Sequence, residues 1–145
     1  MRVSTVCLFC GLLLFLSGCA GYRTMNRQEA CDKVIKTYNR MIRWQEAEKA
    51  ALTYVDRSQR DRFVGAAESL RRRNVTMADM RILASECRAE HRSAEAVVEF
   101  DYFVLPDNRL KTVTDRQKWL FREESSDLPD QTEGWKLTTP LPEFK

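Results

Sequence analysis

Histidine is almost absent from this chain, and glycine is scarce: the 145 residues include one histidine, His91, and five glycines. The glycines form neither the phosphate-binding loop of nucleotide enzymes nor the Gly-x-Ser-x-Gly turn of many hydrolases. His91 falls in a predicted polar turn, and one histidine with two cysteines far apart in the sequence, Cys31 and Cys87, gives little support for a metal site. We therefore expect no catalytic residues, no metal and no cofactor.

The sequence also lacks a large excess of charge of one sign. Lys and Arg number 24 and Asp and Glu number 21, which gives a formal net charge of +3. A nucleic-acid-binding protein would gather a basic excess on one face, so nucleic acid is not an expected partner. The one basic cluster, Arg71-Arg72-Arg73, falls where a predicted helix ends and the helix dipole favours positive charge. Contact with anionic lipid is the alternative.

The apolar run near the start of the chain is too short to cross a membrane. It follows Arg2 and extends over about 11 residues, from Val6 to Leu16, whereas a membrane-spanning helix needs about 20. A charged start followed by a short apolar run and then small residues is typical of a secretory signal peptide.

The next residues, Leu16-Ser17-Gly18-Cys19, resemble the lipobox of bacterial lipoproteins. In that family the cysteine thiol takes a diacylglyceryl group, a peptidase cuts before it, and the new amine is usually acylated. The resemblance implies a signal peptide over residues 1–18, cleavage between Gly18 and Cys19, and a lipid anchor on Cys19 stable enough to hold the chain at a membrane. Because Ala20 is not Asp, it also implies sorting to the outer membrane, facing the periplasm. An ordinary signal peptide with a chance cysteine is the alternative.

Cys31 and Cys87 are the cysteines that remain after Cys19 in a chain exported to a compartment that permits disulfides. A bond between them would close a loop of about 57 residues and contribute roughly 4 kcal/mol on the chain-entropy model. Two thiols buried as small apolar side chains are the alternative.

After a lipidated N-terminus and short tether over residues 19–25, the pattern predicts one domain over residues 26–145, with helices first. A capping box at Asn26–Glu29 predicts the start of the first helix. Apolar residues from Ala30 to Ile42 then recur at three- and four-residue steps, with Cys31 on the buried face. A second helix is predicted between Trp44 and Val55, and a third after Asp56.

Beyond Thr76 the period changes to the alternation of strands. Strands are predicted over residues 80–89, 94–104, about 109–123, and from Gly134 to Leu137, followed by an extended tail. Glu95, Glu99 and Asp101 alternate away from the apolar residues of their strand, so they should face away from the helices. Three helices packed on a curved four-stranded antiparallel meander make an α+β domain.

Several segments of this domain look like NTF2-like (cystatin-like α+β) lipoproteins, many of which have no assigned function. They are Ile42–Ala47, Val75–Ile82, Gln117–Trp119, Gly134–Leu137 and the closing Pro142-Glu143-Phe144. The resemblance covers about residues 26–144 and implies helices on the concave side of the sheet, often around a conical pocket. The chain departs from some members of that superfamily because no strand pair is predicted between its helices.

Two functions are compatible with these features. The first, which the short tether favours, is a non-catalytic interaction module that docks onto an envelope protein at the membrane surface. Its exposed apolar patch would comprise Val97, Phe103, Trp119 and Phe121, unless the tail or another sheet contact covers them. The second is a domain that binds a small apolar ligand in the cone between helices and sheet, in a cavity of at least about 300 Å³. The residues predicted to line it are Tyr38, Tyr54, Phe63, Phe100 and Tyr102.

Overall fold

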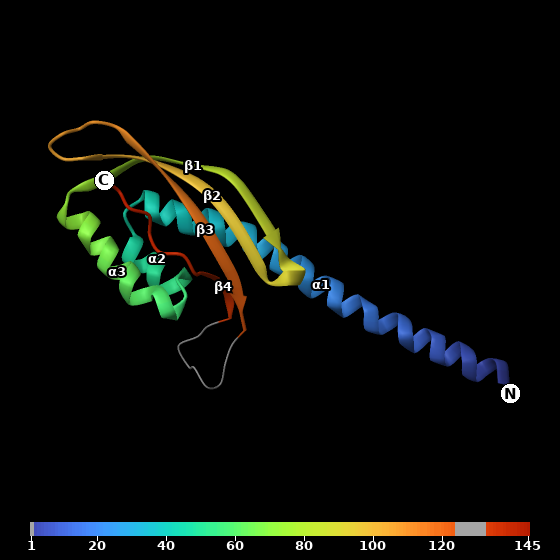
Figure 1. The fold of residues 1–145 in the computed structure, drawn as a ribbon. Helices are drawn as coiled ribbons and strands as arrows, with labels where there is room; N and C mark the ends of the chain where they lie inside the picture. Colours follow the sequence, from blue (N-terminus) through green and yellow to red (C-terminus); the bar gives the residue numbers. More distant parts are fainter. Residues whose placement is uncertain (1, 124–132) are drawn as a thin grey trace.

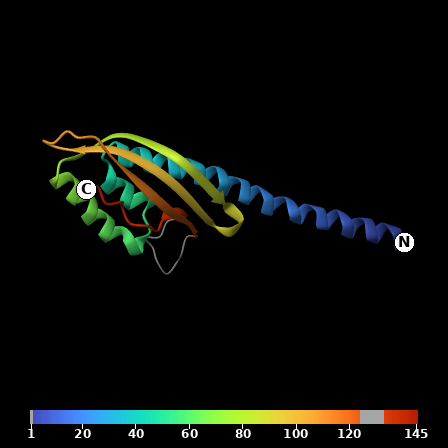
Figure 2. The ribbon, with the colours of Figure 1, turned by 45° about the horizontal axis from the view of Figure 1, so that its top comes forward.

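The computed structural model of the chain describes residues 2–123 and 133–145, with side chains from residue 23 onward. Three helices precede four strands: α1 Arg2–Arg43, α2 Ala47–Tyr54, α3 Arg57–Arg72, β1 Val75–Arg88, β2 Ser93–Val104, β3 Lys111–Arg122 and β4 Gly134–Leu137. The helices pack on one side of the curved sheet, as Figures 1 and 2 show. The predicted fold class, three N-terminal helices on a four-stranded antiparallel meander, is therefore confirmed.

Helix α1 is one continuous element of 42 residues and projects well beyond the sheet toward the N-terminus (Figure 1). The predicted helix start at Asn26 is wrong, because the residues before it are also helical and already supply carbonyl acceptors for the next turn. Packing on the domain begins near Arg27, whose carbonyl accepts a 3.0 Å hydrogen bond from Trp135 Nε1. In the described part of the chain, no helix is both long enough and apolar enough to cross a membrane.

Helices α2 and α3 are joined by Val55 and Asp56, and this link is fixed to the sheet. Asp56 caps α3, since its Oδ1 accepts a 3.2 Å hydrogen bond from Ser58 N. Its Oδ2 accepts a 2.8 Å hydrogen bond from Arg122 Nε, at the end of β3. Asp56 N donates to Leu137 O at 2.8 Å, so the start of α3 is tied to both β3 and β4.

The sheet has the order β1-β2-β3-β4, and all neighbouring strands are antiparallel. Strand β1 begins at Val75 rather than at the predicted Met80. Its register against β2 shifts between Met77 and Asp79 and again between Ile82 and Ala84. Such bulges reverse the inward and outward positions, and a simple alternation therefore does not identify the first part of this strand.

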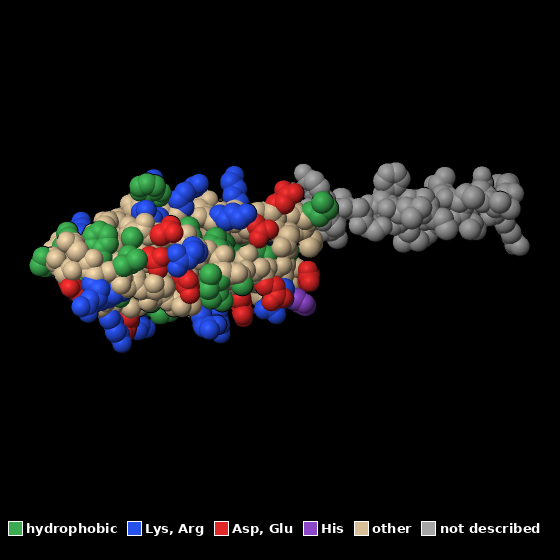
Figure 3. All heavy atoms as spheres, turned by 90° about the horizontal axis from the view of Figure 1, so that it is seen from above, with side chains coloured by type: hydrophobic (Ala, Val, Ile, Leu, Met, Phe, Trp, Pro, Cys, Tyr) green, Lys and Arg blue, Asp and Glu red, His purple; other side chains and the backbone are tan. Residues whose placement is uncertain are grey.

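The inner face of β2 is uniformly buried, with Ala94, Ala96, Val98, Phe100 and Tyr102 in the core. Its other face points away from the helices, as the alternation predicted. On that outer face the Asp101 carboxylate lies 2.7 Å from Arg81 Nη1 and accepts a 2.6 Å hydrogen bond from Thr112 Oγ1. Figure 3 shows charged side chains of both signs interspersed with apolar ones on this side of the molecule.

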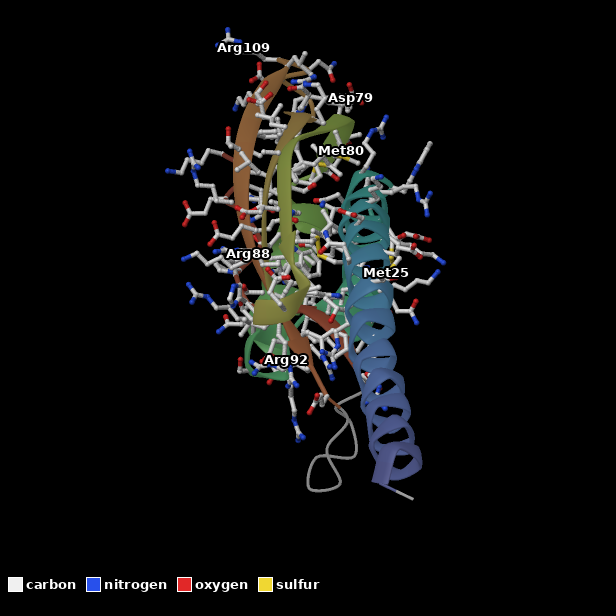
Figure 4. All side chains as sticks on the ribbon, turned by 90° about the vertical axis from the view of Figure 1, so that its right-hand side faces the viewer. Met25, Asp79, Met80, Arg88, Arg92 and Arg109 are labelled. Carbon is white, nitrogen blue, oxygen red and sulfur yellow. A yellow bond between two sulfur atoms is a disulfide. The ribbon has the colours of Figure 1, made fainter. Side chains whose placement is uncertain are left out.

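A disulfide joins Cys31 of α1 to Cys87, near the end of β1, with the two Cα atoms 6.3 Å apart. Figure 4 shows α1 running beside β1, with Arg92 and Arg109 at opposite ends of the sheet. The bond spans 56 positions of sequence, and closing a loop of that length contributes roughly 4 kcal/mol to stability on the chain-entropy model. It holds the first helix against the edge of the sheet.

Candidate functional site

A polar cluster lies between α1 and the inner face of β3. Asn39 Nδ2 donates to Gln117 Oε1 at 3.1 Å, and Gln117 Nε2 donates to Asn39 Oδ1 at 2.7 Å. Gln117 Oε1 also accepts from Trp119 Nε1 at 3.3 Å, and Asn39 Nδ2 donates to Ile35 O at 2.8 Å. The two amides are buried and well supplied with partners, so they position α1 against β3.

Asp115 extends this cluster toward the surface. Its Oδ2 accepts a 2.8 Å hydrogen bond from Gln117 Nε2, and the residue is 5% exposed. Burial raises the pKa of Asp115 to about 6, although the hydrogen bond from Gln117 favours the ionised form. A buried carboxyl that titrates near neutral pH is a candidate for binding a cationic group.

The phenol of Tyr38 belongs to the same region. Its ring makes edge contacts with Trp119 and Phe63, at centroid distances of 5.2 and 6.3 Å. Among the described residues, its buried hydroxyl has no hydrogen-bond partner. Burial, and then the negative charge of Asp115, raise the pKa of Tyr38 well above its ordinary value, so the phenol stays protonated and keeps a hydrogen to donate.

A hollow of about 650 Å³ opens beside Asp115. One wall is the first part of β3, residues 112–116, and the other is the C-terminal tail, residues 139–143 with Lys145. The tail runs back along β3 after β4 (Figure 1). The hollow is broadly open to solvent, and it brings a strand edge and a buried carboxyl into one site.

The end of the tail is anchored in the core. The Phe144 ring contacts those of Tyr102 and Phe100, at centroid distances of 5.1 and 6.1 Å. Tyr102 Oη accepts from Lys145 N at 2.9 Å and donates to Lys145 O at 2.7 Å, while Arg73 Nη1 donates to Phe144 O at 2.7 Å. Phe144 therefore lies against two of the aromatic residues that were predicted to line a ligand pocket.

Four of the five residues predicted to line that pocket take part in aromatic core contacts, and four of the five lie away from the hollow beside β3. Tyr38 packs on Phe63, and Phe100 and Tyr102 pack on Phe144. Tyr54 is half-buried, and Tyr102 is the one of the five that lines the hollow. Ligand binding in the cone stays a prediction.

One residue of the predicted exposed apolar patch, Trp119, is buried, so the prediction for it is wrong. It is 1% exposed, because its strand face meets α1 and its ring packs on Tyr38. Phe121, on the same face, is half-buried with its ring 5.6 Å from that of Trp135. Val97 and Phe103 are half-buried on the outer face of β2. The part of β3 that carries Trp119 and Phe121 pairs with β4, and the Trp135 ring of β4 packs on Phe121.

The remaining predicted residues are placed as follows. Gly18 and Cys19 fall within helix α1, and their side chains lie outside the described ones. His91 is exposed in the 3-10 turn Ala89–His91. Across the described ranges, no three His, Cys, Asp or Glu side chains are grouped so that they could hold a metal ion.

A second hollow, of about 360 Å³, lies where the end of α1 meets α2, α3 and β1. Arg71 Nη1 and Glu48 Oε1, both on its lining, lie 3.7 Å apart. The buried apolar side chains that line it are Ile42, Ala67, Leu70, Val75 and Met77. This hollow could not be predicted from the sequence, because its lining comes from four elements.

Asn39 and Asp115 were not singled out from the sequence either, although a signal for each was present. Asp115 lies two residues from both Val113 and Gln117, so the three side chains share one face of the strand, and Asn39 follows Ile35 by four residues on the helix. A polar residue at a core position of either pattern is a marker of a buried polar site.

The comparisons with known proteins assign this fold to no family. No family model matches the sequence, and no curated protein matches it. One solved structure with a similar arrangement is the intermembrane space region of the chloroplast protein ARC6. The match has a TM-score of 0.43 and 9% sequence identity, and covers 77% of this chain and 92% of that one. At these values the likeness carries no functional information.

Proposed function

We propose that this chain is an exported protein anchored through a lipid on Cys19, and that its folded domain is a non-catalytic interaction module at the membrane surface. The lipobox-like residues Leu16–Cys19 support the anchor. The Cys31–Cys87 disulfide supports an oxidising, extracytoplasmic compartment. Ala20 favours the outer membrane, facing the periplasm, and the quoted sequence segments favour a divergent NTF2-like lipoprotein.

The observation that carries the proposal is the continuity of α1. Cys19 lies on the same helix as Tyr38 and Asn39, which pack in the core of the domain. From Cys19 to Arg27, where packing on the sheet begins, the helix rises about 12 Å. A lipid at Cys19 would therefore hold the domain close to the bilayer on a helical stalk, with a set distance and orientation. Such a stalk suits contact with one partner at the membrane surface.

The packing between the helices and the sheet favours an interaction module rather than a domain that binds a small ligand in the cone. Phe144 lies against Phe100 and Tyr102, where a ligand would otherwise enter between helices and sheet. The hollow of about 650 Å³ lies instead beside a strand edge at the surface.

The anchor is tested by replacing the proposed lipid acceptor. Cys19→Ala should abolish incorporation of labelled palmitate and leave either an unprocessed precursor or a protein released from membranes. Cys10→Ala is the matched control, because it removes a thiol of the apolar run without touching the lipobox-like residues. Normal processing and membrane association of Cys19→Ala would contradict the anchor.

The interaction is tested by crosslinking the anchored protein in cells at native level, followed by mass spectrometry. We expect one dominant partner in near-equal amount. A folded, monomeric protein without a partner would contradict the interaction module.

A small apolar ligand is the second candidate function, and the hollow of about 360 Å³ favours it, because its volume falls in the range of ligand pockets. Native mass spectrometry of the membrane-extracted protein should then show a bound small molecule that Ala67→Phe displaces. Glu68→Gln, at the next position of α3, is the control because residue 68 is not among the lining residues.

A further inference from the structure

Strand β3 is paired along most of its length on one side and along a much shorter part of it on the other. On the β2 side, pairing extends from Lys111 to Leu120. On the β4 side, it covers Trp119 to Arg122. The first half of β3, residues 112–116, therefore has one edge without a neighbouring strand among the described residues.

The backbone groups at this edge can be identified from the hydrogen bonds further along β3. Phe121 N donates to Arg92 O, on the β2 side, at 2.9 Å. Lys118 O accepts from Thr138 N at 2.9 Å on the opposite side. Because successive residues of a strand direct their backbone groups to alternate sides, the N–H and C=O groups that face the tail belong to Thr112, Thr114 and Arg116. None of them has a partner in the part of the chain that the structure describes.

The tail passes this edge but cannot complete the sheet. Since Trp119 is paired with Leu137, the same register would place Pro140 opposite Arg116 and Pro142 opposite Thr114. Proline has no N–H to donate, so both positions that should bond to the edge lack a donor. The tail diverges after Thr139, and the hollow of about 650 Å³ lies between the two segments.

The side chains of the hollow also favour a cationic group. Asp115 lines it, with its side chain on the inner face of the strand, and Gln117 is the one described residue that donates to its carboxylate. A residue directly opposite Asp115 on an added strand would place its side chain on the same face, at a Cβ distance of about 5 Å. A Lys or Arg at that position complements a buried carboxylate that has no cationic partner.

We propose that the open edge of β3, Thr112 to Arg116, accepts one extended segment of a partner protein as an additional strand, with a Lys or Arg of that segment opposite Asp115. This inference rests on the proposed interaction module and names its docking site. Main-chain hydrogen bonds to Thr114 and Arg116 would give affinity, and the ion pair with Asp115 would give selectivity.

The probe for this site is a capped heptapeptide of alternating threonine and valine with lysine at its centre, added to the full processed protein in detergent. We expect saturable binding, with the largest amide NMR shifts at Thr114 and Arg116. The same peptide with a central glutamate should bind about tenfold more weakly or worse, because like charges would meet at Asp115. That difference should disappear in Asp115→Asn.

A matched pair of variants tests the main-chain contacts. Thr114→Pro removes the N–H from the open edge at a position where proline is tolerated, and it should weaken binding at least about tenfold. Thr114→Ala keeps the N–H and should bind as the unmodified protein does. Equal binding by both variants, or binding of a peptide whose edge-facing amides are N-methylated, would overturn the proposal. Self-association through this edge without peptide would overturn the assignment to a partner protein.

Failure of this site and failure of the proposed function give different results. If no peptide binds while the crosslinked partner is still found, the docking site is wrong and the interaction module stands. If no partner is found at all, the proposed function is contradicted, whether or not the peptide binds.

Discussion

The two halves of strand β3 have similar backbones but different neighbours. From Trp119 to Arg122 the strand pairs with β4, and up to Leu120 it pairs with β2 as well. From Thr112 to Arg116 it has β2 on one side and a hollow open to solvent on the other. The boundary between the halves is set by the tail, because prolines occupy the positions that would continue β4. The extent of a sheet can thus depend on the segment beside a strand more than on the strand itself.

The inner faces of the two halves also differ, in the kind of side chain that each half buries. In the closed half, Trp119 packs on Tyr38 in an aromatic core. In the open half, the buried side chain is the carboxyl of Asp115. A buried acid is costly in a closed core, whereas at an open edge it is within reach of water or of a partner's cation.

The largest effect is expected in the closed half. Trp119→Ala should lower the free energy of unfolding by about 3–5 kcal/mol, because it removes a fully buried aromatic ring. Urea unfolding followed by circular dichroism measures this loss. Thr114→Ala, on the exposed face of the open half, is the control and should change stability by less than about 0.5 kcal/mol. A loss at Trp119 no larger than that at Thr114 would contradict the difference between the halves.

The next effect concerns Asp115 and depends on pH. Its pKa in the folded protein, about 6, lies above the ordinary value of 3.8. Because the folded protein holds the proton of Asp115 more tightly than the unfolded chain does, protonation of this carboxyl stabilises the fold. This stabilisation is fully present below about pH 4 and is lost as the pH rises through 6. The loss amounts to about 3 kcal/mol at most. Asp115→Asn should therefore be more stable than the unmodified protein at pH 7.

The pH dependence is measured as the difference in unfolding free energy between the two proteins, from urea unfolding at several pH values between 4 and 8. That difference should grow with pH and level off above about pH 7. Thr114→Ala, which removes no ionisable group, serves as the control and should show no such trend. If Asp115→Asn were less stable than the unmodified protein at every pH, the account of this carboxyl would be wrong.

The smallest change in stability is expected when the boundary between the halves is removed. Pro140→Val with Pro142→Val restores two N–H donors opposite Arg116 and Thr114, so the tail should close onto β3. The gain from two hydrogen bonds is offset by the greater freedom of the unfolded chain, and stability should change by no more than about 1 kcal/mol. The readout is binding of the lysine peptide, which the closed tail should block. Undiminished peptide binding by this variant would show that the prolines do not keep the edge open.

Much of the fold could be predicted from the sequence, because each prediction depended on local periodicity. The alternation of β2 identified both its buried face and the outward direction of Glu95 and Glu99. The helical stripe placed Cys31 on the buried face, where it forms the disulfide with Cys87. The order of three helices and four strands then led to the α+β meander.

The features that escaped prediction depend on contacts between distant segments. The register shifts in β1 come from its pairing with β2, and no period within β1 alone reveals them. Trp119 was read as exposed because the covering elements, α1 and β4, lie far away in the sequence. The open edge beside Asp115 also required the register of β4, which places Pro140 and Pro142 opposite β3.

The most direct test of the open edge is hydrogen exchange of the β3 amides, measured by NMR on the full processed protein without any partner. The account predicts that the amides of Thr114 and Arg116 exchange nearly as fast as in an unfolded chain. Those of Leu120 and Arg122, which face β4, should exchange slower by on the order of a thousandfold. If Thr114 and Arg116 were protected as strongly as Leu120, the edge would already be occupied within the molecule, and the account of the docking site would be contradicted.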